Sequence, residues 1–129
     1  MNAKIPFLAI SVTLFLGLVS CDDDGSEADR QGIGAACVTS KDCADKGQTC
    51  LGFKGGYCGV ADCVDNTACP TGSACVKHDD GKNYCFRVCV EKIDCNANRP
   101  AESESNCSSK AALVSGGKEA KVCVPPSGS

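Results

Sequence analysis

The sequence predicts a small disulfide-rich domain of three four-cysteine modules, each with a short antiparallel β-hairpin, and little helix beyond the N-terminal segment. Cysteine supplies 13 of the 129 residues, aromatic residues make up only 5 % of the chain, and the cysteines recur at a fixed spacing. A chain so poor in large side chains cannot bury enough apolar surface to offset its conformational entropy. Disulfides, at about 2–4 kcal/mol each, are expected to supply the missing stability.

Residues 1–20 are predicted to be a signal peptide. Lys4 precedes an apolar run from Ile5 to Val19, which is shorter than the ~20 residues of a membrane-spanning helix. The string Leu18-Val19-Ser20-Cys21 resembles the bacterial lipobox. This resemblance implies that cleavage falls before Cys21 and that Cys21 is acylated, so that the protein is anchored to a membrane by lipid. Cysteine parity agrees, because 12 of the 13 cysteines remain to pair once Cys21 is set aside. An ordinary secretory signal or an uncleaved anchor is the alternative.

Residues 21–34 are expected to form the acylated N-terminus and a flexible acidic tether, because the stretch from Asp22 is acidic, contains glycine and has few apolar residues. A lipid anchor predicts a place in the cell envelope, with the outer membrane or cell surface favoured. Asp22 resembles the inner-membrane retention signal of enteric bacteria, so the periplasmic face of the inner membrane is the alternative.

The cysteines after the tether show an internal period. Cys37, Cys63 and Cys89 are spaced by 26 residues, and each is followed by valine. The same period separates Cys43, Cys69 and Cys95. Two positions that keep one period indicate related modules. The predicted modules are residues 35–60, residues 61–88, and residues 89–129, the last including a C-terminal tail.

Each module ends in a predicted hairpin between its third and fourth cysteines. Asp80-Gly81 suits a type I′ turn, and the third hairpin is expected to turn at Ser115-Gly116-Gly117. Tyr57 and Tyr84 directly precede the fourth cysteines and are expected to cover a disulfide.

The favoured pairing joins the first cysteine to the third and the second to the fourth in each module. It gives Cys37–Cys50, Cys43–Cys58, Cys63–Cys75, Cys69–Cys85, Cys89–Cys107 and Cys95–Cys123. A bridge from the third to the fourth cysteine is the rival, and the spacing does not decide between them. The polar loop from Asn96 to Asn106 is expected to be exposed and mobile.

Three strings carry a family resemblance: Cys37-Val-Thr-Ser-Lys-Asp-Cys43, Cys69-Pro-Thr-Gly-Ser-Ala-Cys75 and Gly56-Tyr57-Cys58. They resemble the cysteine-rich repeat lipoproteins of myxobacteria and related bacteria, and they are distantly similar to EGF-like and Dickkopf-type modules. The resemblance implies an exported, disulfide-bonded domain, and it implies no particular activity.

Charge and residue types argue against several functions. A net charge of −3 with no basic cluster argues against a nucleic-acid partner. His78 is the only histidine, so no catalytic set can be drawn, and neither an enzyme nor a cofactor is expected. The closest cysteine pair is Cys85-x3-Cys89, whereas metal sites typically use Cys-x2-Cys, so the spacing argues against a metal site. Asp42 and Asp94 faintly resemble calcium ligands of EGF modules and are expected to cap turns instead.

The sequence therefore predicts a non-catalytic interaction module that binds another protein or a surface glycan through exposed loops. The candidate binding residues at the hairpin tips are Phe53, Lys54, His78, Asp79 and Lys82. The alternatives are a protease inhibitor or toxin-like effector, a structural surface spacer, and a metal-binding protein.

Overall fold

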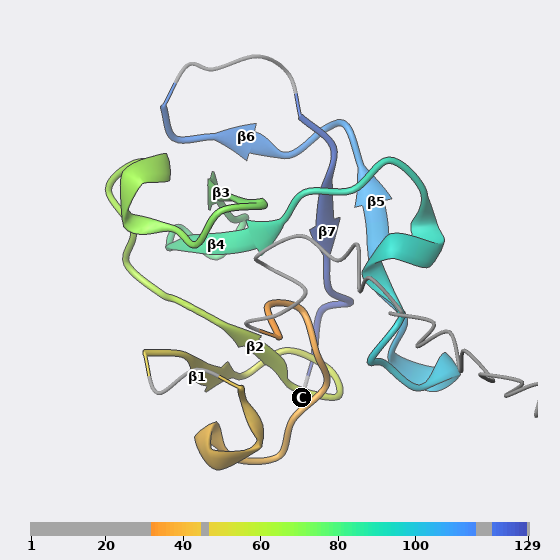
Figure 1. Cartoon of the computed structure of the whole chain (residues 1–129). Coiled ribbons are helices and arrows are strands. Elements are labelled where there is room, and N and C mark those ends of the chain that lie inside the picture. Colours follow the sequence, from red (N-terminus) through yellow and green to blue (C-terminus); the bar gives the residue numbers. More distant parts are fainter. Residues whose placement is uncertain (1–31, 45–46, 116–119, 129) are drawn as a thin grey trace, which may run out of the picture.

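The computed structural model describes residues 32–44, 47–115 and 120–128 (Figure 1). Cys21, the predicted signal peptide and most of the predicted tether lie outside these residues. The described part confirms the fold class: it is a small disulfide-rich β protein with six disulfides and short antiparallel strands. Its helical segments are 3-10 turns of three or four residues. No helix in the described ranges is long and apolar enough to cross a bilayer.

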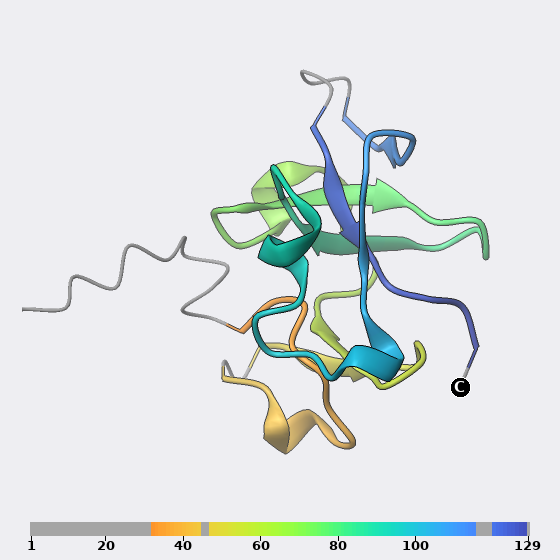
Figure 2. The ribbon, with the colours of Figure 1, turned by 90° about the vertical axis from the view of Figure 1, so that its right-hand side faces the viewer.

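The strands form three small antiparallel sheets. The strands are β1 (Thr49–Leu51), β2 (Tyr57–Gly59), β3 (Ser73–Lys77), β4 (Asn83–Arg87), β5 (Asn106–Ser108), β6 (Ala112–Leu113) and β7 (Val122–Val124). The sheet orders are β1-β2, β4-β3-β6 and β5-β7. The 3-10 turns are η1 (Ser40–Asp42), η2 (Asn66–Ala68), η3 (Lys92–Cys95) and η4 (Ala101–Ser103). Figure 2 shows β7 crossing the β3-β4 hairpin, where Val88 and Val122 form an isolated bridge.

Three of the four strand pairs, β1-β2, β3-β4 and β5-β7, place their module's third and fourth cysteines directly opposite one another. The opposed pairs are Cys50 and Cys58, Cys75 and Cys85, and Cys107 and Cys123. None of these pairs is bonded. Each cysteine bonds instead to a cysteine of the preceding loop, and all six disulfides follow the favoured first-to-third and second-to-fourth pattern. Opposed residues of an antiparallel pair point to the same face of the sheet. The two disulfides of each module therefore attach the preceding loop to that face. The rival third-to-fourth bridge is wrong.

The third module differs from the simple hairpin expected for it. β5 and β7 do pair, but the chain between them first contributes β6, which pairs with β3 of the second module. Gly116 and Gly117 of the predicted turn lie outside the described residues. The second and third modules therefore share a sheet, and they do not fold as separate units.

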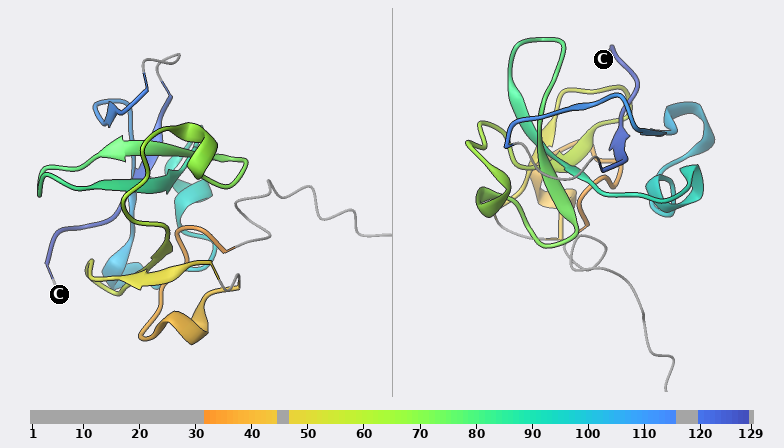
Figure 3. Two further views of the ribbon diagram at one scale, coloured as in Figure 1. Left: turned by 90° about the vertical axis from the view of Figure 1, so that its left-hand side faces the viewer. Right: turned by 90° about the horizontal axis from the view of Figure 1, so that it is seen from above.

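One hydrophobic core draws on all three modules. Its buried members are Ile33, Leu51, Phe53, Tyr57, Ala74, Val76, Tyr84, Phe86 and Val122. Four aromatic rings form its centre: Tyr84 stacks on Phe86, and the ring of Phe53 meets those of Tyr57, Tyr84 and Phe86 edge to face. Phe53 and Tyr57 come from the β1-β2 hairpin and Tyr84 and Phe86 from the β3-β4 hairpin, and the left view of Figure 3 shows the β1-β2 pair below the β3-β4 hairpin. Ile33, which was predicted to belong to the tether, is buried in this core.

The loop from Asn96 to Asn106, expected to be exposed and mobile, is exposed at most positions, but three of its side chains are buried. Arg99 is buried, and its guanidinium donates hydrogen bonds to the main-chain oxygens of Ser103, Gly34, Gly56 and Lys54 at 2.7–3.1 Å. One buried side chain thus attaches a largely exposed polar loop to main-chain oxygens of the first module.

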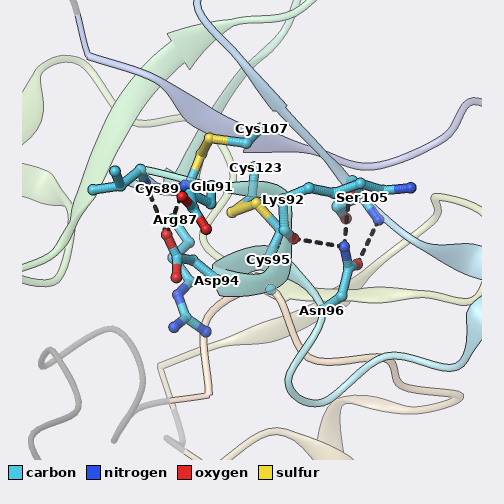
Figure 4. The surroundings of a disulfide bond; sticks show 12 residues. Arg87, Cys89, Glu91, Lys92, Asp94, Cys95, Asn96, Ser105, Cys107 and Cys123 are labelled. Atoms are coloured by element: carbon cyan, nitrogen blue, oxygen red, sulfur yellow. Dashed lines mark hydrogen bonds between the residues drawn. A yellow bond between two sulfur atoms is a disulfide. The ribbon is translucent and has the colours of Figure 1, made fainter.

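Asn96, the first residue of the same loop, attaches it to the rest of the third module. Its side chain donates to the carbonyl oxygens of Lys92 and Ser105 and accepts from the Ser105 N–H, beside the two disulfides of the third module (Figure 4). Two side chains thus replace the regular backbone pairing that this segment lacks.

Candidate binding pocket

A pocket of about 220 Å³ lies where the end of the β3-β4 hairpin meets the segment between β5 and β6. Its lining residues are Val76, Lys77, His78, Asp79, Phe86, Ser108, Lys110, Ala111, Ala112 and Val124. The second module supplies one wall and the third supplies the other. The pocket therefore depends on β6 joining β3, which brings Ala112 beside Lys77.

The pocket combines an apolar floor with a polar rim. Val76 and Phe86 are buried core residues, while Lys77, Asp79 and Lys110 are exposed. Small side chains at Ala111 and Ala112 keep the wall open. An apolar concavity with a few polar groups around it is the usual form of a binding site.

His78 is the half-buried member of the rim and is held from two sides. Its ring lies against the core, with centroids 5.2 Å from Phe53, 5.8 Å from Tyr84 and 6.0 Å from Phe86. On the other side its Nδ1 is 3.3 Å from Oδ1 of Asp80. The imidazole is therefore fixed by the fold, unlike the solvated side chain expected at a hairpin tip.

Asp80 organises the turn that positions His78. Its carboxylate accepts hydrogen bonds from the Lys82 N–H at 2.9 Å and from the Tyr84 hydroxyl at 2.7 Å. These two bonds, the main-chain one first, hold the pKa of Asp80 below its usual range. Burial and the bond to Asp80 raise the pKa of Tyr84 to about 12. At neutral pH a neutral phenol thus donates to an ionised carboxylate.

The rim lysines carry charge that the fold does not neutralise. An ion pair joins Lys92 to Glu104, but neither Lys77 nor Lys110 has a carboxylate partner within the described part of the chain. Two ammonium groups from different modules therefore remain free to meet an anionic group.

A second concavity is lined by Ala36, Cys37, Val38, Asp42, Gly55 and Pro100. It is more open, and its one charged side chain is already engaged, because Asp42 Oδ2 accepts the N–H groups of Val38 and Thr39 at 2.9 and 2.8 Å. It offers a ligand few free polar groups.

The structure brings together only part of the predicted site. His78 and Asp79 line the pocket. Lys54 and Lys82 are exposed but lie outside its lining. Phe53 is only 8 % exposed, so it is a core residue behind His78 and not the exposed hairpin-tip residue that the sequence predicted. Its ring packs against those of Tyr57, His78, Tyr84 and Phe86.

The residues missed by sequence reasoning come mostly from the third module. Ser108, Lys110, Ala111, Ala112 and Val124 line the pocket only because β6 leaves its own hairpin to pair with β3. A two-residue strand of alanine and leucine carries no pairing signal, so no local pattern could have found them.

The cysteine clusters and the recurrent aspartates have structural roles. Three groups of sulfurs lie within 4.8 Å of one another, but each sulfur is already bonded in a disulfide, whereas a metal needs thiolates. Asp94 Oδ2 accepts the N–H groups of Val90 and Glu91 at 2.9 Å, as Asp42 does in the first module. These carboxylates cap turns, and the main-chain bonds hold the pKa of each below its usual range.

No family model, curated protein or solved structure matches this chain.

Proposed function

We propose that the chain is a lipid-anchored, disulfide-rich protein of the cell envelope that acts as a non-catalytic interaction module. The pocket beside His78 is the observation that carries this proposal, and a partner protein or surface glycan is its ligand. The lipobox-like string ending at Cys21 supports the anchor. The six disulfides support an oxidising location outside the cytoplasm.

The rigidity of the pocket walls favours binding over a purely structural spacer. Disulfides Cys63–Cys75 and Cys89–Cys107 each end on or next to a strand that borders the pocket. Walls that are already ordered lose little conformational entropy when a ligand binds. A spacer would need no such concavity with free ammonium groups at its rim.

The exposed lysines at the hairpin tips do not favour a protease inhibitor. An inhibitory loop of the substrate-like kind presents an extended backbone with a free carbonyl to the protease. Here the carbonyl of Lys54 accepts from Arg99 at 2.9 Å, and the carbonyl of Lys82 accepts from the His78 N–H at 2.8 Å. Both main-chain groups are already used inside the fold.

Occlusion of the pocket tests the binding role. Ala112 is exposed and lines the pocket, so Ala112→Tyr fills it while suiting a strand position. Ala68 is exposed and outside the lining, so Ala68→Tyr is the matched control. The full-length protein, extracted in mild detergent, is cross-linked in envelope preparations, and each variant is checked by mass for intact disulfides. Cross-linked products seen with wild type and Ala68→Tyr but lost with Ala112→Tyr support the proposal. Identical products from all three proteins overturn it.

The anchor has a separate test. Cys21→Ser is expected to move the protein from the membrane fraction to a soluble or unprocessed form, because the acylated sulfur is gone. A cleaved Cys21→Ser product that stays in the membrane fraction as wild type does would contradict lipid anchoring.

A further inference from the structure

The chemistry of the pocket narrows the kind of ligand. Resting on the proposed binding role, we infer that the pocket receives an acidic side chain, Asp or Glu, of a protein partner. The carboxylate is held by the ammonium groups of Lys77 and Lys110.

Charge is the first argument. Both lysines line the pocket, and neither has a carboxylate partner in the described ranges. Other lysines of the described ranges also lack a carboxylate partner, and Lys77 and Lys110 differ from them by lining the same pocket. An incoming carboxylate would form charge-assisted hydrogen bonds with both ammonium groups.

Size is the second argument. The cavity of about 220 Å³ is smaller than the roughly 300–1,000 Å³ of pockets that hold drug-sized ligands or cofactors. It suits a single side chain inserted from a larger partner. The methylene groups of that side chain would lie on the apolar floor formed by Val76 and Val124.

The aromatic residues argue against a sugar. Rings that bind sugars present an open face on which the apolar side of the sugar lies. Among the described residues the aromatic side chains of Phe53, Tyr57, Tyr84 and Phe86 are each at most 8 % exposed. None of them offers such a face, so a protein partner is favoured over the surface glycan.

Asp79 argues for one negative charge rather than two. Its exposed carboxylate lies on the same rim as the lysines. Lys77, Lys110 and Asp79 together carry a net charge of +1, which one carboxylate neutralises, whereas a doubly charged phosphate would leave an excess negative charge beside Asp79. The site therefore selects carboxylate over phosphate.

The test uses three immobilised peptides of one sequence, Ala-Ala-Leu-X-Leu-Ala-Ala with blocked ends, where X is Glu, Gln or phosphoserine. The analyte is the full-length protein in mild detergent. The Lys77→Gln/Lys110→Gln double variant removes the two rim charges. The Lys54→Gln/Lys82→Gln double variant removes two exposed charges outside the pocket and is the matched control, with the same change in net charge.

Wild type is expected to bind the Glu peptide about tenfold more tightly than the Gln peptide, as two exposed ion pairs of up to about 1 kcal/mol each allow. It is expected to bind the Glu peptide more tightly than the phosphoserine peptide as well, because Asp79 repels the second negative charge. The pocket double variant is expected to lose this preference, while the control double variant keeps it. The preference is expected to weaken as salt is added.

Equal binding of the Glu and Gln peptides, tighter binding of the phosphoserine peptide, or equal losses in the two double variants would each overturn the inference. These outcomes are separable from failure of the proposed function. If Ala112→Tyr still abolishes cross-linking, the pocket binds a partner by other chemistry. If it does not, both proposals fall.

Discussion

The phenolic hydroxyl of Tyr57 donates a hydrogen bond to the carbonyl oxygen of Cys123, 3.2 Å away and 66 residues later in the chain. The same hydroxyl accepts the main-chain N–H of Arg87 at 3.1 Å. The Arg99 guanidinium lies over the Tyr57 ring, 5.7 Å from its centroid. One buried side chain of the first module thus contacts the end of β4 and both halves of the third module. This contact fixes the relative positions of the two modules that form the pocket.

Removing the Tyr57 hydroxyl should destabilise the fold. Tyr57→Phe keeps the ring but leaves the Cys123 carbonyl and the Arg87 N–H without this partner in the interior, so the free energy of unfolding should fall by about 1–3 kcal/mol. Denaturant unfolding with the disulfides intact measures it. Tyr84→Phe is the control, because the Tyr84 hydroxyl bonds to the exposed Asp80, and its loss should be smaller. Equal losses would show that the Tyr57 hydroxyl has no special role.

The inward folding of residues 96–106 should depend on the planar guanidinium of Arg99. Arg99→Lys keeps the charge, but its ammonium group cannot reproduce the four hydrogen bonds that the guanidinium donates to Ser103, Gly34, Gly56 and Lys54. The loop should then open, and a glutamate-specific protease should cleave after the exposed Glu102 much faster than in wild type. Lys92→Arg, at an exposed position on η3, is the control and should leave the rate unchanged. An unaltered rate in Arg99→Lys would mean that other contacts hold the loop.

Gly56 should be irreplaceable, for a reason that Gly81 does not share. Both have positive φ, +69° and +85°, but a Cβ at Gly56 would lie 2.0 Å from the Cys37 carbonyl oxygen, while at Gly81 it would meet nothing within 4 Å. Gly81→Ala should cost about 1 kcal/mol through backbone strain alone. Gly56→Ala should block native oxidation of the first module. Disulfide mapping of each purified variant distinguishes them, and native pairing in Gly56→Ala at wild-type yield would refute the expected clash.

Acid should weaken the fold through the turn-capping aspartates. The pKa values of Asp42 and Asp94 are lower in the folded protein than in the unfolded chain. Their stabilisation is therefore complete above the unfolded pKa of about 4 and is lost as the pH falls through the lower folded value. The midpoint of denaturant unfolding should be flat near neutrality and fall below about pH 4. In the Asp42→Asn/Asp94→Asn double variant that fall should be shallower, and an unchanged pH dependence would count against the caps.

The cysteine framework could be predicted because its signals are local and periodic. The spacing of Cys37, Cys63 and Cys89 set the module limits, and the Gly-containing stretches before Cys58 and Cys85 marked two hairpins that the structure contains. The favoured pairing assumed that the N-terminal loop of each module is disulfide-bonded to both strands of its hairpin. All six disulfides follow this pairing.

The contacts between modules could not be predicted, because they join residues far apart in sequence. The bonds from Arg99 to Gly34 and Lys54 span 65 and 45 residues, and no pattern around an arginine in a polar loop distinguishes it from a solvated one. The pocket could not be predicted for the same reason, because its lining residues come from separate stretches of two modules. Phe53 was predicted to lie at a hairpin tip, but it belongs to the shared core, and no sequence pattern pointed to Lys110, which lines the pocket.

The central claim is that six disulfides, two within each module, stabilise a folded body whose three modules share one core, and limited proteolysis with and without reductant tests it most directly. The full-length protein in native buffer should retain a protease-resistant fragment covering about residues 32–128, and this fragment should disappear within the same digestion time once a phosphine reductant is added. A resistant fragment of unchanged size and lifetime in the reductant, with all cysteines shown by alkylation to be free, would contradict the account.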